Sequence, residues 1–72
     1  MDLIEHTTEA RLGREEAASR LRALADELSR HNEISFLREG IRYTVKVPNE
    51  VDFSLEIEVG GDESEIEIEL KW

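Results

Sequence analysis

The chain has 72 residues, of which 18 are acidic and nine are lysine or arginine, so its formal net charge is −9 at pH 7. A chain of this length forms one domain, and the lack of cysteine excludes disulfides and cysteine-ligated zinc. The acidic excess disfavours direct binding to nucleic acid. No long apolar run follows Met1, so we expect a cytoplasmic protein with neither a signal peptide nor a membrane span.

The first half of the chain predicts a strand followed by a helix. Apolar and polar residues alternate over residues 4–12, which indicates a strand with a weak apolar face. From Arg14 to about His31, apolar residues recur at helical spacing. Gly13 can form the N-cap of this helix, and Asn32 can form a left-handed C-cap. The apolar helix positions are Ala17, Leu21, Leu24, Ala25 and Leu28.

The second half predicts an antiparallel meander with strong period-2 alternation. The strands are expected at residues 34–36, 41–47, 51–59 and 65–72, with turns at 38–40, 48–50 and 60–63. The clearest alternation is in the last strand, whose apolar face consists of Ile66, Ile68, Leu70 and Trp72. We therefore expect an α+β fold of order β-α-β-β-β-β, in which one α-helix packs on a mainly antiparallel β-sheet of four to five strands in two layers.

Cross-strand pairing indicates the register of this meander. A three-residue loop at 48–50 brings opposite charges together twice, which supports pairing of 41–47 with 51–59. The oppositely charged pairs are Lys46–Asp52 and Arg42–Glu56, and Thr44 lies opposite Ser54 between them. A four-residue loop at 60–63 gives the apolar pairs Ile57–Ile66, Leu55–Ile68, Phe53–Leu70 and Val51–Trp72. It also gives two glutamate pairs that are unfavourable in dilute salt, Glu58–Glu65 and Glu56–Glu67.

The expected sheet is wider than the expected helix. Four or five strands at about 4.8 Å spacing span roughly 20–24 Å, whereas a helix with its side chains is about 10–12 Å across. We therefore expect an uncovered apolar strip that packs on a second copy of the chain or on a protein partner. Trp72 can either close the core or take part in such an interface, where tryptophan is over-represented.

The acidic residues near the C-terminus form the main candidate surface for chemistry. Residues 50–72 hold nine acidic residues and one lysine, a net charge of −8. Their outward face carries Glu56, Glu58, Glu65, Glu67 and Glu69. Such a cluster can bind divalent cations weakly or raise the pKa of one carboxyl, but ligands on a flat strand do not converge as calcium sites require. The competing interpretation is a solvated face adapted to high salt, since only two of the nine basic residues are lysine.

The other reactive side chains do not form a recognisable catalytic motif. His6 and His31 are isolated in the sequence, and a lone histidine is more often packed or capping than catalytic. Residues 60–63 match four letters of the GGDEF signature of diguanylate cyclases, but Ser64 stands in the fifth place and a hairpin loop accounts for the glycines. We therefore predict no catalytic residues, no cofactor and no metal ligands.

Several segments together resemble the amphi-Trp domain proteins of bacteria and archaea. The resemblance rests on a short N-terminal strand, the helix opening Gly13-Arg14-Glu15-Glu16-Ala17, the stretch Leu21-Arg22-Ala23-Leu24-Ala25, and an alternating acidic and apolar strand that closes on Glu69-Leu70-Lys71-Trp72. It covers residues 1–72 as a single domain and departs from the family at Gly13, where a serine or threonine cap is usual. The family is named for a pattern, so the resemblance implies no catalytic residues, cofactor or substrate.

Composition and patterning together favour a small non-enzymatic module that acts in protein interaction or assembly. The expected partner is an unknown protein or a second copy in a homodimer, and neither nucleic acid nor a membrane is expected. The candidate interaction surface comprises Trp72, Glu56, Glu58, Glu65, Glu67 and Glu69. The alternative is a divalent-cation-binding or catalytic domain that uses the acidic sheet face. A third hypothesis, an acidic mimic of nucleic acid, rests on charge alone.

Overall fold

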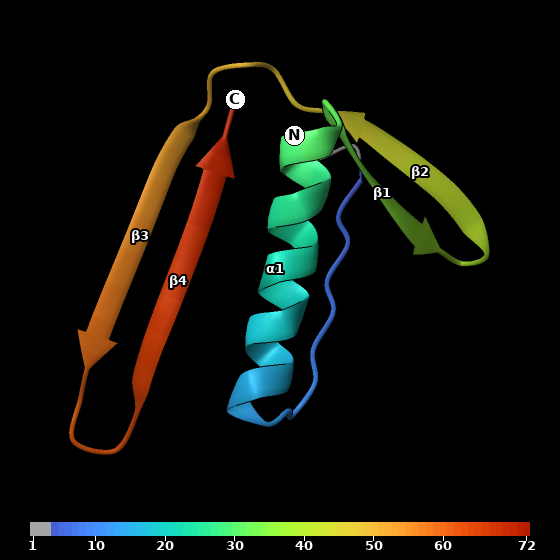
Figure 1. Cartoon of the computed structure of the whole chain (residues 1–72). Coiled ribbons are helices and arrows are strands. Elements are labelled where there is room, and N and C mark those ends of the chain that lie inside the picture. Colours follow the sequence, from blue (N-terminus) through green and yellow to red (C-terminus); the bar gives the residue numbers. More distant parts are fainter. Residues whose placement is uncertain (1–3) are drawn as a thin grey trace.

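The computed structural model describes residues 4–72 as one helix and two antiparallel β-hairpins (Figure 1). The elements are α1 (Arg14–Arg30), β1 (Glu33–Arg38), β2 (Ile41–Lys46), β3 (Asp52–Val59) and β4 (Ser64–Lys71). Strands β1 and β2 form one two-stranded sheet, and β3 and β4 form another. The α+β class is therefore confirmed, whereas the single two-layer sheet of four to five strands is wrong. Over residues 4–72, no helix combines the length and apolarity needed to cross a membrane.

Helix α1 begins directly after Gly13, as the spacing of its apolar residues predicts. The Gly13 carbonyl oxygen accepts the backbone N–H of Ala17 at 3.0 Å, although glycine has no side chain to cap the remaining free N–H groups. Glu15 and Glu16 lie in the first turn, where they favour the helix dipole, and Glu16 forms an exposed ion pair with Arg20 at 3.6 Å. These local interactions define α1 without burying any of its residues.

The end of α1 lacks the left-handed cap predicted at Asn32, and that prediction is wrong. His31 is extended, with φ −132° and ψ 151°, and its backbone N–H donates to the Glu27 carbonyl oxygen at 2.9 Å. The chain continues directly into β1, so no left-handed reversal is needed at this point.

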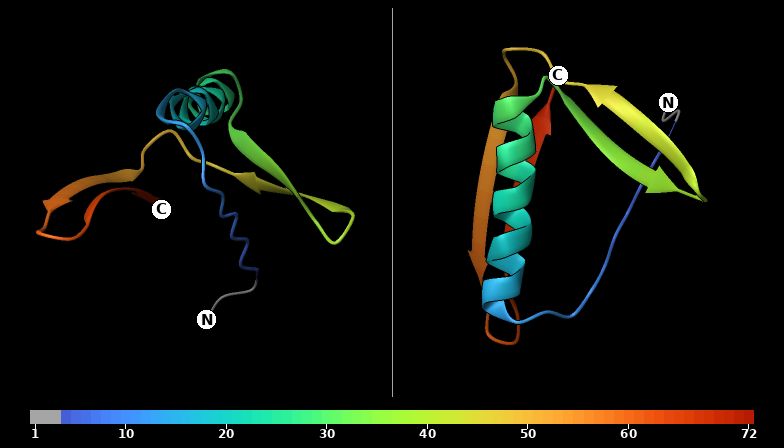
Figure 2. Two further views of the ribbon diagram at one scale, coloured as in Figure 1. Left: turned by 90° about the horizontal axis from the view of Figure 1, so that it is seen from below. Right: turned by 45° about the vertical axis from the view of Figure 1, so that its right-hand side comes forward.

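Residues 4–12 do not form the predicted first strand; they run as an irregular segment (Figure 2). Their alternating face includes His6 and Thr8, which contribute too little apolar area to hold a strand against a sheet. The His6 ring instead stacks on Phe36 of β1, with ring centroids 4.8 Å apart. His6 is therefore in aromatic contact, which agrees with a packing role.

The β1–β2 hairpin is held by its turn and by a contact with α1. Glu39 and Gly40 both have positive φ, 53° and 78°, which is the pattern of a type I′ turn and suits the twist of the strands. The backbone N–H of Ser35 donates to Glu27 Oε1 of α1 at 2.9 Å. A side chain of the helix thereby satisfies a backbone donor on β1 and fixes this hairpin to the helix.

We expect Glu39→Asn to stabilise the β1–β2 hairpin by about 0.5–1 kcal/mol, because asparagine adopts positive φ more readily than glutamate. Gly40→Ala, at φ 78°, is expected to destabilise the chain by about 1 kcal/mol for the converse reason. Urea unfolding of both variants measures the two changes in the free energy of unfolding. Equal midpoints for both variants would contradict the turn assignment.

Strands β2 and β3 are not paired with each other, so the predicted hairpin through a loop at 48–50 is wrong. The backbone N–H of Val47 donates to the Asn32 carbonyl oxygen at 2.7 Å, which extends the β1–β2 ladder by one pair beyond Glu33–Lys46. Pro48 follows and has no N–H to donate. Residues 47–51 therefore lead the chain away from β2, and the β3–β4 hairpin projects separately (Figures 1 and 2).

The register of the β3–β4 hairpin agrees with the sequence prediction. Its apolar pairs Phe53–Leu70, Leu55–Ile68 and Ile57–Ile66 are confirmed, as are the glutamate pairs Glu56–Glu67 and Glu58–Glu65. The loop at residues 60–63 closes with a hydrogen bond from the Gly60 N–H to the Glu63 carbonyl oxygen at 2.9 Å. A Cβ at Gly60 would lie 2.7 Å from that oxygen, so only glycine fits there.

Candidate functional site: an uncovered apolar surface

One face of the β3–β4 hairpin is apolar along its whole length and faces solvent. Residues opposite each other in the register share a face, and the alternation extends to the chain end. We call this the apolar hairpin face; it consists of Phe53, Leu55, Ile57, Val59, Ile66, Ile68, Leu70 and Trp72. Ile57 is 65% exposed and Val59 is 82% exposed, although strands normally bury such residues. Among the described elements, α1 packs against β1, and the β3–β4 hairpin stands apart from α1.

Helix α1 also presents apolar side chains to solvent. Leu21 and Leu24 are both exposed. They line a shallow groove of about 450 Å³ between the helix and the N-terminal segment. The groove is lined by Thr8, Ala10, Leu12, Ala17, Arg20, Leu21 and Leu24. The helix stripe predicted to face a core therefore faces an open space.

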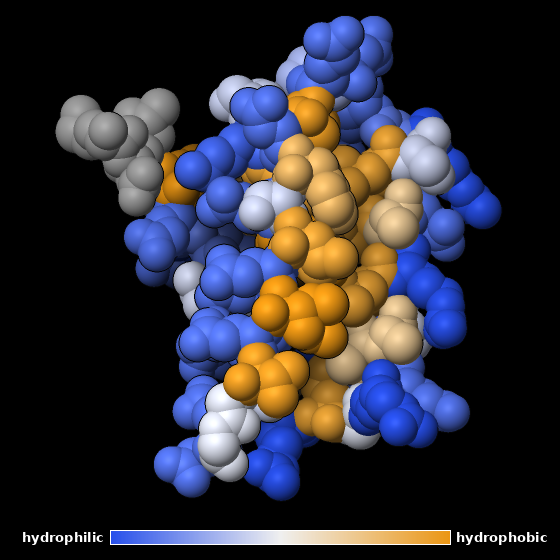
Figure 3. Space-filling model, turned by 90° about the vertical axis from the view of Figure 1, so that its left-hand side faces the viewer, coloured by the Kyte–Doolittle hydropathy of each residue, from blue (hydrophilic) through white to orange (hydrophobic). Residues whose placement is uncertain are grey.

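An exposed apolar band lies on the side of the molecule that carries β3 and β4. Figure 3 looks onto that side and shows a continuous apolar band that runs along the molecule between hydrophilic borders. Monomeric soluble proteins rarely expose contiguous apolar patches larger than a few hundred Å². The band is therefore a candidate contact surface.

The part of the chain that the structure describes has almost no core of its own. Among residues 4–72, only Val47 is buried, at 9% exposure. The accessible surface is 6953 Å², whereas a folded monomer of 8.3 kDa is expected to expose about 4,600 Å². The radius of gyration is 14.2 Å, against about 11 Å for a compact chain of this length. Both quantities describe an open arrangement whose apolar surface lacks a cover.

The opposite face of the β3–β4 hairpin is acidic. We call its glutamates the acidic hairpin face: Glu56, Glu58, Glu65, Glu67 and Glu69. The carboxylates of Glu65 and Glu56 raise the pKa of Glu67, and a side-chain hydrogen bond with Glu65 adds to the increase. Lys71 Nζ lies 3.5 Å from Glu69 Oε1 and partly balances this charge. Within residues 4–72, no three acidic or histidine side chains come together in an arrangement that could hold a metal ion.

Glu67→Gln is expected to raise the unfolding temperature at neutral pH in dilute salt, because it removes a carboxylate that its neighbours repel. The raised pKa means that the folded chain binds this proton more tightly than the unfolded chain does. The destabilisation is therefore fully present above the folded pKa and is relieved as the pH falls toward the unfolded pKa.

Thermal unfolding followed by circular dichroism across the acidic range would reveal this component in the wild type, where stability rises as Glu67 is protonated. Glu67→Gln should lack it. The control Glu9→Gln removes the same charge from the N-terminal segment and should keep the wild-type pH profile. Identical profiles for Glu67→Gln and the wild type would contradict the assignment.

Trp72 lies at the open end of the apolar hairpin face and is 59% exposed. It borders a shallow depression with the start of β3, lined by Glu50, Val51, Asp52 and Lys71. The interpretation in which Trp72 closes the core of its own chain is therefore not what the structure shows. Its position fits the interface interpretation, since exposed tryptophan next to an apolar strip is typical of contact surfaces.

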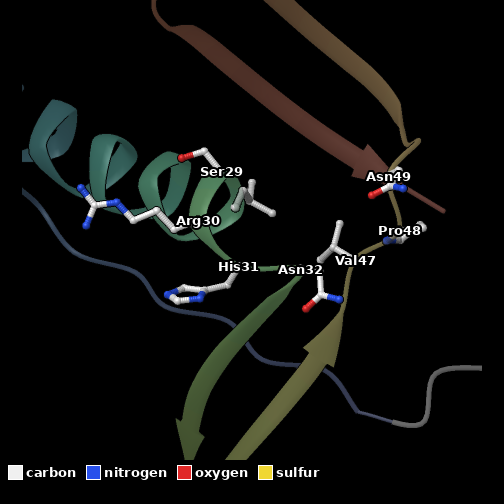
Figure 4. A pocket seen from close by; sticks show the side chains of 8 residues that line it. Ser29, Arg30, His31, Asn32, Val47, Pro48 and Asn49 are labelled. Carbon is white, nitrogen blue, oxygen red and sulfur yellow. The ribbon is translucent and has the colours of Figure 1, made fainter.

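A second depression marks the junction between α1, β2 and residues 47–51 (Figure 4). It has a volume of about 330 Å³ and is lined by Leu28, Ser29, Arg30, His31, Asn32, Val47, Pro48 and Asn49. The side chains of Arg30 and His31 point away from Asn49, so the polar groups do not converge on one point (Figure 4). This junction works as a connection between the helix and the projecting hairpin.

The comparisons with known proteins support the resemblance inferred from the sequence. The family model of the Amphi-Trp domain matches residues 3–72. No curated protein and no solved structure matches the chain. The family match covers the helix, both hairpins and the acidic C-terminal strand, so the resemblance is confirmed over the whole chain.

Proposed function

We propose that this chain, which belongs to the Amphi-Trp domain family, is an assembly module that acts through protein contacts on its apolar surface and not through catalysis. The observation that carries the proposal is the apolar hairpin face, which no element within residues 4–72 covers. Its side chains are mostly half to four-fifths exposed, and Figure 3 shows a continuous apolar band on the side of the molecule that carries β3 and β4.

Two further properties support this function. A two-stranded hairpin by itself is only marginally stable in water, so β3 and β4 need another protein surface to become firmly ordered. The acidic hairpin face keeps the free chain soluble, because its charge opposes non-specific association. In this proposal the apolar hairpin face makes the specific contact, and the acidic hairpin face keeps the free chain soluble.

The alternative inferred from the sequence, a cation-binding or catalytic acidic face, makes a different prediction. Titration with calcium or magnesium, followed by NMR, would produce saturable shifts confined to the five glutamates of that face. The assembly proposal predicts only the general effects of added salt on these resonances. The carboxylates lie on a flat hairpin, an arrangement that spreads the ligands apart.

Photo-crosslinking in the native cell tests the assembly proposal. A photoreactive phenylalanine analogue at Leu55, on the apolar hairpin face, is expected to form covalent adducts with protein. The same analogue at Glu56, one residue away on the acidic face, is the matched control and should form far fewer adducts. An absence of protein adducts from position 55 would overturn the proposal.

A further inference from the structure

We propose that the apolar hairpin face is covered by a second copy of the same chain, through reciprocal exchange of the β3–β4 hairpins. In this arrangement β2 of one copy pairs with β3 of its partner, which gives two four-stranded sheets, and α1 of each copy lies over the apolar face of the hairpin that it receives. The inference rests on the proposed assembly function and names its partner. Three observations carry it: the excess surface, the charge distribution, and the unpaired edges of β2 and β3.

The excess surface has the size that an obligate dimer requires. Each chain exposes about 2,400 Å² more than a compact monomer of its mass. Two copies that covered this excess would bury on the order of 5,000 Å² in total, which lies in the range of obligate homodimers. Such interfaces resemble a domain core divided in two, and the one buried residue among residues 4–72, Val47, shows that each copy lacks such a core.

The charge distribution favours exchange over direct contact between two β3–β4 hairpins. Residues 50–72 carry a net charge of −8, so two of these segments packed together would repel each other strongly. Residues 14–46, which contain α1, β1 and β2, hold seven basic and six acidic residues, a net charge of +1. Exchange places each acidic hairpin against the slightly basic part of the other copy.

The free edges of β2 and β3 are complementary in charge and in apolar pattern. Alignment of Thr44 with Ser54 places Arg42 opposite Glu56. The same alignment places Lys46 opposite Asp52. It also joins the two apolar faces, through the pairs Ile41–Ile57, Tyr43–Leu55 and Val45–Phe53. A shift by one residue would set apolar against polar positions, and a shift by two would leave one opposite-charge pair in place of two, so this register is favoured.

Within one chain, the connection between the hairpins leads β3 away from β2 (Figures 1 and 2). Residues 47–51 include Pro48, whose fixed φ restricts this connection, and the outer edges of β2 and β3 stay unpaired. A short, restricted connection is a known route to exchange of identical elements between protomers. Each copy can therefore pair its free strand edges with those of its partner.

Charge reversal on two separate chains tests the exchange. R42E and E56R each place like charges opposite each other twice in a dimer of one variant, so each is expected to weaken dimerisation at least about tenfold. When the two variants are unfolded and refolded together, every β2–β3 pair of the mixed dimer joins opposite charges. Native mass spectrometry should show the mixed dimer recovering to near the wild-type dissociation constant.

A matched control separates this pairing from a general charge effect. E63R makes the same charge reversal at the tip of the β3–β4 loop, outside the β2–β3 register. In its mixed dimer with R42E, one of the two β2–β3 pairs still joins like charges, so only part of the affinity that R42E loses should return. Recovery with E63R equal to that with E56R would overturn the exchange, and so would failure of R42E and E56R to recover together.

The oligomeric state separates failure of this inference from failure of the proposed function. Light scattering should give twice the chain mass of 8.3 kDa for the wild type. A stable monomer that crosslinks other proteins from position 55 would overturn the exchange and support the assembly function. A stable monomer without protein adducts at that position would overturn both.

Discussion

Replacement of Ile57 by aspartate is expected to prevent assembly while leaving the local hairpin register intact. Ile57 lies near the middle of the apolar hairpin face, pairs with Ile66 and is 65% exposed in the single chain. An interface would remove its side chain from water. Full burial of an isoleucine stabilises an interface by about 1.5–3 kcal/mol, and the substitution loses this contribution. Burial of an unpaired carboxylate is unfavourable by a larger amount, so both changes weaken association.

The expected loss in association free energy is therefore at least about 3 kcal/mol, or more than 100-fold in the dissociation constant. Sedimentation equilibrium or light scattering over a concentration series measures this change. The intrinsic fluorescence of Trp72 provides a second readout: we expect its emission to shift to shorter wavelength on association in the wild type, and not in Ile57→Asp.

Gly61→Asp is the matched control for Ile57→Asp. It introduces the same charge in the loop between β3 and β4, outside the apolar hairpin face and the β2–β3 register, where an added Cβ meets no atom within 4 Å. We expect this control to associate nearly as tightly as the wild type. If both variants dissociate equally, the effect comes from net charge, and the apolar hairpin face is not the contact surface.

The second large effect expected is a rise in unfolding temperature with KCl. The acidic hairpin face sets Glu56 against Glu67 and Glu58 against Glu65, within a segment of net charge −8. Their repulsion is long-ranged in dilute buffer, but the screening length falls from about 10 Å at 0.1 M salt to about 3 Å at 1 M. We expect a rise of several degrees from low to molar KCl, measured at one protein concentration because assembly also affects unfolding temperature.

A variant with fewer charges separates screening from other effects of salt. The double substitution Glu65→Gln with Glu67→Gln removes one carboxylate from each opposed pair and leaves the apolar hairpin face unchanged. Its unfolding temperature should start higher in dilute salt and rise less with KCl. A flat wild-type response, or equal slopes for the two proteins, would contradict the electrostatic interpretation.

The parts of the fold that the sequence predicted well are those held by local interactions. Helix α1 follows the spacing of its own apolar residues, and the turn at Glu39-Gly40 follows the positive φ that glycine allows. The β3–β4 register follows from period-2 alternation and a four-residue loop. In each case the decisive contacts lie within a few residues along the chain or across one tight turn.

The predictions that failed depend on contacts between elements. Residues 4–12 alternate like a strand, but they find no sheet edge and line a groove on α1 instead. The charges of β2 and β3 match in the predicted register, yet residues 47–51, which include Pro48, lead β3 away from β2 and the two strands do not pair. Which elements pack or pair with each other depends on where the connecting segments place them in space. Side-chain alternation and cross-strand charge pairing do not specify that placement.

The candidate site was foreseen in part. The mismatch in width between helix and sheet indicated an uncovered apolar strip, and Trp72 was placed at its end. The acidic hairpin face was also predicted as a surface, and its mutual repulsion appears as the raised pKa of Glu67. The extent of the exposure was missed, because a predicted single sheet implied that β2 and β3 would shelter each other.

By itself, the sequence determined the elements, the register of the acidic hairpin and the separation of apolar from acidic residues onto its two faces. Side-chain alternation and turn geometry suffice for these features. Only the tertiary structure decided that the β3–β4 hairpin stands apart from α1 and leaves its apolar face open. The physical reason is that the hydrogen bond from the Ser35 N–H to Glu27 fixes the β1–β2 hairpin to the helix, whereas within residues 4–72 no hydrogen bond joins β3 or β4 to α1.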